Sequence, residues 1–393
     1  MLTSLSPTLV IGSQTDPQTL GLDLTEPDVR RSPGRHPHAG GAVKAQYGIA
    51  GSCQPRRAVL PTSARWAPGT AHPVAALSVS ARTFATETTF EMVMTMTTID
   101  EQAAVLALTK ATHDKPWFYT ARVILDAGSA LELLDGGYAC RDEDDQAHAA
   151  AIAARVQPGD LAWGRDLIAT MRADGVHLVT VLDDAYPGNA IWAYDRQPFL
   201  WIRGCFQAAD HRAVAVVSEY DAGHAIAAAR ALAEAGLTVV APLRTDLNAA
   251  VHRAALAAGG RTLAVLAGGI TEPATLGEYA SVAERIAGRG AMVSPFWPGT
   301  APTGRTVAPA RIVTCGLADC LYVIDGADGG LAARHVEEAL QTGKRVFVSQ
   351  RLQQEQPWVD RAALRGGMTG VQDIDDLSQQ AVNLVMTPRT HTC

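Results

Sequence analysis

Residues 213–260 read AVAVVSEYDAGHAIAAARALAEAGLTVVAPLRTDLNAAVHRAALAAGG, and this stretch decides the fold class. Two short, continuous apolar runs, 213–217 and 237–241, are each followed by an alanine-rich helical segment that ends near glycine. Apolar runs without polar alternation are typical of parallel strands buried on both faces, and glycine is the common residue just beyond a helix end. The stretch therefore predicts two consecutive strand–helix units of a parallel sheet.

The same alternation continues along the chain, with further apolar runs at 262–266, 291–294, 320–324 and 345–349. Repeated strand–helix units predict an α/β fold, with a Rossmann-like, doubly wound, mostly parallel sheet over residues 176–350. We expect residues 351–393 to extend this core and to end in a tail.

Two segments of different character precede this core. Residues 98–175 have helical periodicity and predict a small all-helical domain, with Asp100 as the cap of its first helix. Residues 1–95 are rich in Pro, Gly, Ser, Thr and Arg and have no sustained period, which predicts disorder. An alternative is that this segment is a mis-assigned start and that the protein begins at Met92, Met94 or Met96.

The bulk composition narrows the class of protein. The chain of 393 residues is 47% hydrophobic and 19% charged, which is typical of a globular protein with room for two or three domains. No apolar run reaches the roughly 18 to 20 residues that cross a bilayer, so we expect no membrane span. Six scattered cysteines without a C-x-x-C pair predict free thiols in a reducing cytoplasm.

The distribution of charge restricts how the chain could bind nucleic acid. The net charge is −7, yet residues 1–90 hold eight basic and five acidic side chains, so the folded part is the more acidic one. Binding to nucleic acid would therefore need a local basic groove, because the overall charge does not favour it.

The first strand-to-helix junction follows residue 217. Ligands of such sheets bind beyond the carboxyl ends of the strands, where helix N-termini point unpaired N–H groups at anions. Ser218 could donate a hydrogen bond to a phosphate there, whereas Glu219 would repel one. The junction lacks the G-x-G-x-x-G pattern of dinucleotide sites, and an ordinary turn with Asp221 as the helix cap is the alternative.

The second junction, after residue 241, carries a different set of polar residues. Arg244 supplies positive charge, Asn248 supplies polar contacts, and Thr245 and Asp246 are alternative helix caps. His252 lies four residues after Asn248, so the two can share a helix face. The alternative for His252 is a packed, hydrogen-bonded core histidine.

The last junction places Asp328, Gly329 and Gly330 at a helix start, shortly after Asp325. Glycine lets the backbone approach a phosphate closely, and a plain loop before a helix is the alternative. The chain contains no G-x-S-x-G, H-E-x-x-H or Walker motif. The sequence therefore predicts no catalytic residue, no metal site, no cofactor and no enzymatic activity.

Four stretches together carry a resemblance to a known family. They are YPGNAIWAYDRQPFLWIRG (186–204), the strand–helix stretch from 213 to 270, PARIVTCGLADCLYVIDGADGGLAARHVEEALQTGKRVFVS (309–349) and VDRAALRGGMTGVQDIDDL (359–377). In their order and spacing they resemble the DNA-processing protein A (DprA, or Smf) family, over about residues 98–377. The resemblance implies a Rossmann-like core behind a small helical, SAM-like domain.

The loops depart from the family pattern. Where the family has G-S-R after its first core strand, residues 218–220 read S-E-Y, so the arginine is missing. Residues 241–248 replace the glycine-rich S-G-x-A-x-G-I-D, although His252 of the following helix is kept. One arginine of the family's R-N-R remains as Arg311, and residues 328–331 read D-G-G-L in place of S-G-S-L.

The resemblance implies a divergent, non-enzymatic member that binds single-stranded DNA, forms a homodimer and helps to load a RecA-type recombinase during DNA uptake, transformation or recombination. Such binding needs cations and aromatic faces, which Arg305, Phe296 and Trp297 could add to the loops. Acidic residues in the same loops predict weaker and more salt-sensitive binding. The candidate DNA- or nucleotide-binding residues are Ser218, Tyr220, Arg244, Asn248, His252, Arg311, Asp328, Gly329 and Gly330.

Two other functions compete with this interpretation. One is a nucleotide-binding sensor or enzyme like the LOG-type phosphoribohydrolases, but DGGLAARHVEE (328–338) lacks the third glycine and the threonine of their P-G-G-x-G-T motif. The other is a degenerate relative that has kept the fold for protein contacts alone.

Overall fold

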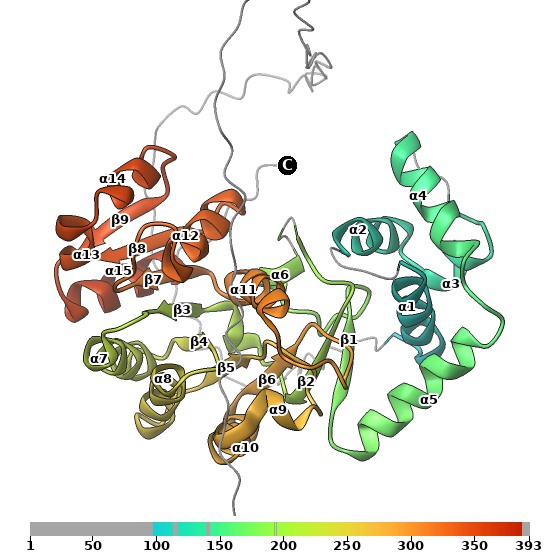
Figure 1. The fold of residues 1–393 in the computed structure, drawn as a ribbon, viewed down its shortest axis with the longest axis horizontal. Coiled ribbons are helices and arrows are strands. Elements are labelled where there is room, and N and C mark those ends of the chain that lie inside the picture. The colour runs from blue at the N-terminus through green and yellow to red at the C-terminus, as the bar shows by residue number, and fades with distance from the viewer. Residues whose placement is uncertain (1–96, 113–116, 139–141, 192, 194, 387–393) are drawn as a thin grey trace, which may run out of the picture. The chain divides into compact units, whose positions relative to one another are not determined.

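The computed structural model describes residues 97–386 except 113–116, 139–141, 192 and 194, and it contains a nine-stranded sheet (Figure 1). The order of the strands across the sheet is β1-β2-β6-β5-β4-β3-β7-β8-β9. Their bounds are β1 (His177–Thr180), β2 (Phe199–Gly204), β3 (Ala213–Val217), β4 (Thr238–Pro242), β5 (Thr262–Val265), β6 (Ala291–Ser294), β7 (Cys320–Val323), β8 (Arg345–Ser349) and β9 (Met368–Val371). The predicted disorder of residues 1–95 lies outside the described residues.

The sheet is parallel from β6 to β9, whereas β2 runs antiparallel to β6 and β1 antiparallel to β2. The predicted Rossmann-like, mostly parallel sheet is therefore confirmed. The chain passes from β3 outward through β4 and β5 to β6, and then returns to the other side of β3 as β7. This reversal creates a topological switch point between β3 and β7, which is where open α/β sheets bind ligands.

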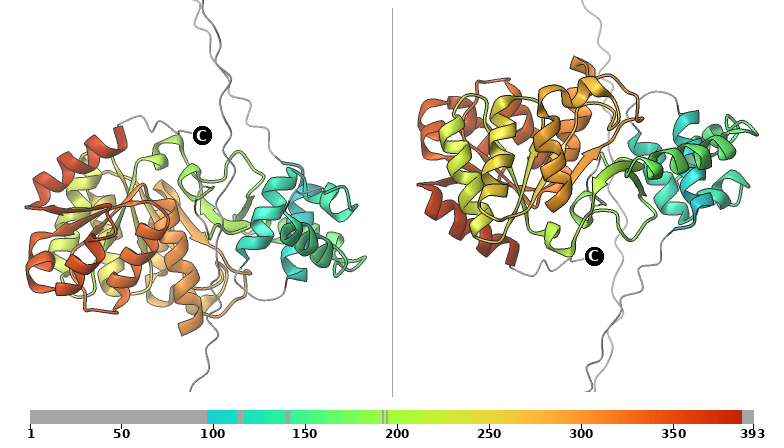
Figure 2. Two further views of the ribbon diagram at one scale, coloured as in Figure 1. Left: turned by 90° about the horizontal axis from the view of Figure 1, so that it is seen from above. Right: turned by 90° about the horizontal axis from the view of Figure 1, so that it is seen from below.

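Helices cover both faces of the sheet (Figure 2). Successive side chains of a strand point to opposite faces, so each apolar strand contributes to a core on either side. Val214 and Val216 of β3 pack in a cluster with α7 (Ala222–Glu234) and α8 (Asp246–Ala257). Ala215 and Val217 pack in another cluster with α11 (Gly304–Leu317) and α12 (Leu331–Gln341). The remaining elements of the core are α6 (Gly188–Ile191), η1 (Ala208–His211), α9 (Pro273–Leu276), η2 (Gly277–Tyr279), α10 (Ala280–Arg289), α13 (Gln350–Glu355), α14 (Pro357–Ala363) and α15 (Ile374–Met386).

The segment in front of the sheet is helical, as predicted. It contains α1 (Ile99–Ala111), α2 (Phe118–Ala127), α3 (Ala130–Leu134), α4 (Glu143–Ala153) and α5 (Asp160–Ala173). The cap of α1 is Thr98, whose side chain accepts a hydrogen bond from Glu101 N at 3.2 Å, and not Asp100, which lies in the first turn. The side chain of Gln102 on α1 donates to the Asp183 carboxylate, which follows β1, at 3.1 Å and so ties this helix to the sheet.

An aromatic cluster also joins the helical segment to the core. The ring of Trp297 lies 5.6 Å from those of Trp117 and Trp163 and 4.7 Å from that of Phe199, between ring centroids. The neighbouring Phe296 is only 4% exposed. The expectation that Phe296 offers a face to DNA is therefore wrong, because its ring is buried. Trp297 is half-buried, and its ring contacts three other aromatic rings.

Two further observations concern the chemistry of the described part of the chain. No helix in it is long and apolar enough to cross a bilayer. Cys315 and Cys320 are buried, and Cys205 is exposed with a free thiol.

The strand β9 was not predicted from the sequence, because MTGV has one buried position in four and no apolar run.

Candidate functional site

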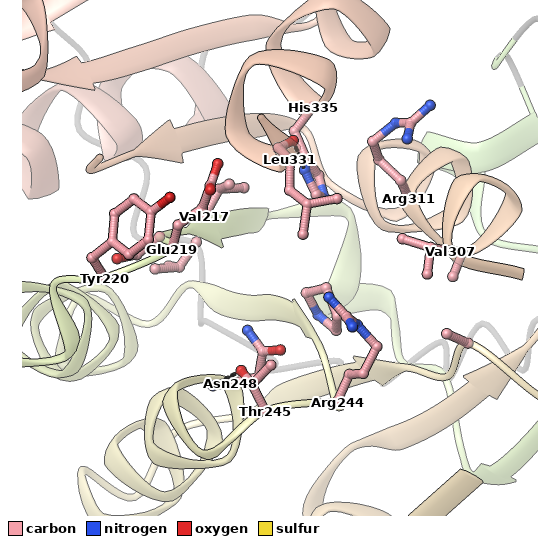
Figure 3. A pocket seen from close by; sticks show the side chains of 15 residues that line it. Val217, Glu219, Tyr220, Arg244, Thr245, Asn248, Val307, Arg311, Leu331 and His335 are labelled. Atoms are coloured by element: carbon pink, nitrogen blue, oxygen red, sulfur yellow. Dashed lines mark hydrogen bonds between the residues drawn. The ribbon is translucent and has the colours of Figure 1, made fainter. Parts of the chain in front are cut away.

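A pocket of about 200 Å³ lies at the carboxyl edge of the sheet, over the switch point (Figure 3). The ends of β3 and β4, the first turn of α8, and the helices α11 and α12 form its wall. The apolar part of the wall is made by Val217, Val307, Ala310 and Leu331. The position agrees with the expectation that the trailing loops of the strands gather on one rim.

The loop between β3 and α7 forms an anion site that the protein itself fills. The carboxylate of Asp325, which is 7% exposed, accepts hydrogen bonds from the backbone N–H groups of Glu219 at 2.7 Å, Tyr220 at 3.0 Å and Asp221 at 2.8 Å. It also accepts from Ser218 Oγ at 2.6 Å. Converging backbone N–H groups of this kind bind anions. The hydroxyl of Ser218, predicted to donate to a phosphate, donates to Asp325 instead.

The start of α12 is a second anion site, and a second carboxylate occupies it. Glu219 Oε1 accepts a hydrogen bond from Ala332 N at 2.8 Å, at the positive end of the helix dipole. A Cβ atom at Gly330 would lie 2.8 Å from the same oxygen, so the glycine makes room for Glu219. Gly329 has φ +68°, a turn conformation that favours glycine. Both glycines were predicted to let the backbone approach a phosphate. In the structure Gly330 leaves space for the carboxylate of Glu219, and Gly329 supplies the turn before the helix.

Asp328 lies on the outer side of this loop. Its carboxylate is 2.5 Å from Arg361 Nη2, both side chains are largely exposed, and Asp328 is not part of the pocket wall. Asp221 caps α7 by accepting from His224 N at 2.9 Å, so the turn-with-cap alternative for the first junction describes its geometry.

The β4–α8 junction turns two polar side chains toward the pocket. Thr245 caps α8 by accepting from Asn248 N at 3.2 Å, which leaves Asp246 in the first helical turn. Arg244 and Asn248 line the pocket and point from this junction toward Leu331 on α12 (Figure 3). The side chain of Arg244 is exposed.

His252 is a core histidine and does not line the pocket. It is fully buried, with Nδ1 2.7 Å from Thr262 Oγ1 and Nε2 3.2 Å from the carbonyl oxygen of Pro242. Burial lowers its pKa to about 4. The residue therefore supports the end of β4 through Pro242, and it cannot contact a ligand in the pocket directly.

The wall on the side of α11 and α12 holds two buried polar groups. Arg311 Nη2 lies 4.0 Å from Glu338 Oε2, and Arg311 Nε is buried without a hydrogen-bond partner among the described residues. His335 is 6% exposed, and its Nδ1 lies 2.7 Å from the carbonyl oxygen of Leu331. Its Nε2 finds no hydrogen-bond partner in the part of the chain that the structure describes. Sequence reasoning missed His335, because one histidine inside an apolar helix gives no motif.

The structure thus divides the nine predicted residues. Tyr220, 72% exposed, belongs to the pocket wall, and an interaction with the Glu219 carboxylate raises the pKa of its hydroxyl. The residues that line the pocket are Ser218, Tyr220, Arg244, Asn248 and Arg311. Those outside its wall are His252, Asp328, Gly329 and Gly330.

Comparison with known proteins agrees with this architecture. DNA processing protein A from Streptococcus pneumoniae is 19% identical in sequence, with a TM-score of 0.54 over 72% of this chain and 98% of that chain, and therefore shares the fold. DNA processing protein A from Helicobacter pylori, which binds single-stranded DNA, is 16% identical, with a TM-score of 0.43 over 53% of this chain and 96% of that chain. No curated protein sequence matches the chain.

The family model described as DNA recombination-mediator protein A matches residues 177–381, which include every strand of the sheet and every part of the pocket wall. Because this match covers more than half of the chain, the protein belongs to the DNA recombination-mediator protein A family.

Proposed function

We propose that this protein binds single-stranded DNA along the carboxyl edge of its sheet, as a DNA-processing protein without enzymatic activity. Membership of the family supports a role in DNA processing. The observation that carries the proposal is Arg244: it is exposed in the wall of the pocket, and no ion pair or hydrogen bond engages its guanidinium among the described residues. A cation in that position suits a phosphate of a nucleic-acid strand.

The surface around Arg244 has the form of a short track. A second hollow adjoins the pocket and shares Arg244, Ala267 and Val307 with it. Arg305, at the start of α11, is exposed on the same side. A strand that crosses both hollows would pass Arg244 at their boundary. Since Arg311 faces Glu338, we expect few phosphate contacts and therefore weak binding whose dependence on salt is shallow, because the slope grows with the number of phosphates contacted.

The finer role follows from the same family resemblance. We propose that the bound strand is handed to a RecA-type recombinase during DNA uptake or recombination, and that the protein acts as a homodimer in the cytoplasm. A nucleotide-cleaving function is less well supported, because Glu219 occupies the helix start at which such an enzyme would hold the phosphate.

Fluorescence anisotropy with labelled oligo-dT at low salt tests the proposal. We expect a Kd in the micromolar range at low salt, and the logarithm of the binding constant should fall linearly with the logarithm of the salt concentration. Arg244→Gln should weaken binding and reduce the salt slope by about 1, because one phosphate contact is lost. The matched control is Arg285→Gln, an exposed arginine on α10 outside the pocket wall, which should change neither. No binding at tens of micromolar refutes the proposed function.

A further inference from the structure

A second pocket, of about 270 Å³, lies near the edge of the sheet at which the parallel strands begin. Its wall contains Leu263, in the first half of β5, and Leu317, the last residue of α11 before β7. Two segments of the chain complete the wall: 184–189, which follows β1, and 206–211, which precedes β3. The pocket that holds Arg244 lies beyond the other ends of these strands, so the two pockets are separate.

Hydrogen bonds within the protein already engage the main polar groups of this wall. Asn189 Nδ2 donates to the carbonyl oxygens of His211 at 3.0 Å and of Leu317 at 3.1 Å. The carboxylate of Asp210, which is 7% exposed, accepts from Arg261 Nε at 2.6 Å. A charged occupant would find few open partners here, and burial of a charge without a partner is costly.

The remaining surface of the pocket is apolar. Ala185, Pro187 and Phe206 line it and are only half-buried, and Leu263 and Leu317 belong to the same wall. Removal of apolar surface from water is favourable roughly in proportion to its area. The pocket therefore suits a run of apolar side chains that lies along it.

The described part of the chain begins close to this pocket, at Thr97. Its Oγ1 donates to the carbonyl oxygen of Leu182 at 3.1 Å, and Leu182 lies two residues before the first wall residue, Asp184. An extended chain spans about 3.3 Å per residue, so the seven residues before Thr97 can reach roughly 23 Å from this anchor. Those residues are therefore long enough to lie along the pocket.

The seven residues 90–96, which precede the described part of the chain, read FEMVMTM. Phe90, Met92, Met94 and Met96 recur at every second position, which would place all four on one face of an extended segment. Methionine is unbranched and polarizable, so it fills irregular apolar spaces well. This face has the chemistry that the wall of the second pocket requires.

We propose that residues 90–96 dock in the second pocket of the same chain as an extended segment, with Met92, Met94 and Met96 against Phe206, Leu263 and Leu317. Such docking would hold the start of α1 on the core, next to Leu182. It would also direct the chain upstream of residue 90 away from Arg244 and the proposed path of DNA. The proposal does not depend on DNA binding.

Photo-crosslinking in the full chain tests this proposal. The photoreactive residue p-benzoyl-L-phenylalanine takes the place of Met94, and after irradiation, proteolysis and mass spectrometry locate the residues that it has joined. We expect crosslinks within one chain to residues 184–189 or 206–211. A crosslink only to other segments, a crosslink between two chains, or no crosslink overturns the inference. The reaction contains no DNA, so its outcome does not depend on the proposed function.

A pocket variant and a matched control make the test specific. Ala208→Trp, at an exposed position of the wall, should fill the pocket and abolish the crosslink. Ala151→Trp places the same side chain at an exposed position of α4 outside this wall and should leave the crosslink unchanged. A crosslink that persists in Ala208→Trp, with a melting temperature close to that of the parent, overturns the inference.

Discussion

The substitution Asp325→Ala tests the structural basis of the switch point most directly. The carboxylate of Asp325 is 7% exposed and accepts four hydrogen bonds, three from backbone N–H groups and one from Ser218 Oγ. Alanine removes the acceptor and leaves these donors to the solvent that reaches the pocket. Removal of one partner from a buried, charged hydrogen-bonded group costs about 3 to 5 kcal/mol, and access of water lowers this figure. We expect a loss of about 3 kcal/mol in the free energy of unfolding.

The same substitution should create a phosphate site. The three N–H groups then surround a vacated position at the start of α7, which favours an anion. Phosphate at about 100 times its Kd stabilises the folded state by about 2.7 kcal/mol, most of the loss from the substitution. Urea unfolding followed by circular dichroism, in phosphate and in chloride of equal ionic strength, measures both effects.

Two controls make this measurement specific. The parent protein in the same two buffers corrects for the general stabilising effect of phosphate, which does not depend on a site. Asp328→Ala removes an exposed carboxylate from the neighbouring part of the loop, and because its ion pair with Arg361 is exposed, the cost should stay below about 0.5 kcal/mol. A loss below about 1 kcal/mol in Asp325→Ala, or equal stabilisation of variant and parent by phosphate, would refute the assignment of Asp325 as the internal anion.

Three further predictions concern stability. Asp210→Ala should destabilise the fold by about 3 kcal/mol in urea unfolding. The substitution leaves the guanidinium of Arg261, which is 13% exposed and whose Nε lies 2.6 Å from Asp210 Oδ1, without its charge partner. A loss below about 1 kcal/mol would contradict this. The free energy of unfolding should fall as the pH drops from about 6.5 to 4. The pKa values of buried His252 and His335 are about 4 in the fold and about 6.5 in the unfolded chain, so the unfolded state binds more protons in this range, and each histidine contributes about 3 kcal/mol. An unchanged dependence of stability on pH in His335→Phe would argue against the contribution of His335. Gly290→Ala should prevent folding or lower the melting temperature strongly, because the new Cβ would lie 1.8 Å from the carbonyl oxygen of Thr262 in β5. A variant as stable as the parent would be inconsistent with this packing.

The candidate site was only partly predictable from the sequence. The rim was predictable because parallel strands bring all their trailing loops to one edge, and the structure brings Arg244, Asn248 and Arg311 together there in the wall of one pocket. The pairing of Asp325 with the β3–α7 loop was not, because the two segments are more than 100 residues apart and meet only when β7 pairs with β3. Glu219 was expected to repel an anion, yet in the fold it is itself the anion at the start of α12.

By itself the sequence determined the α/β class, the succession of strands and helices, and the family, since these depend on local apolar patterns and on the order of motifs along the chain. Only the tertiary structure decided which polar groups remain available to a ligand. The sequence does not show whether a carboxylate or a histidine already has a hydrogen-bond partner, because that depends on contacts between distant parts of the chain. For this protein those contacts close two anion sites with Asp325 and Glu219 and leave His335 Nε2 open in the pocket wall.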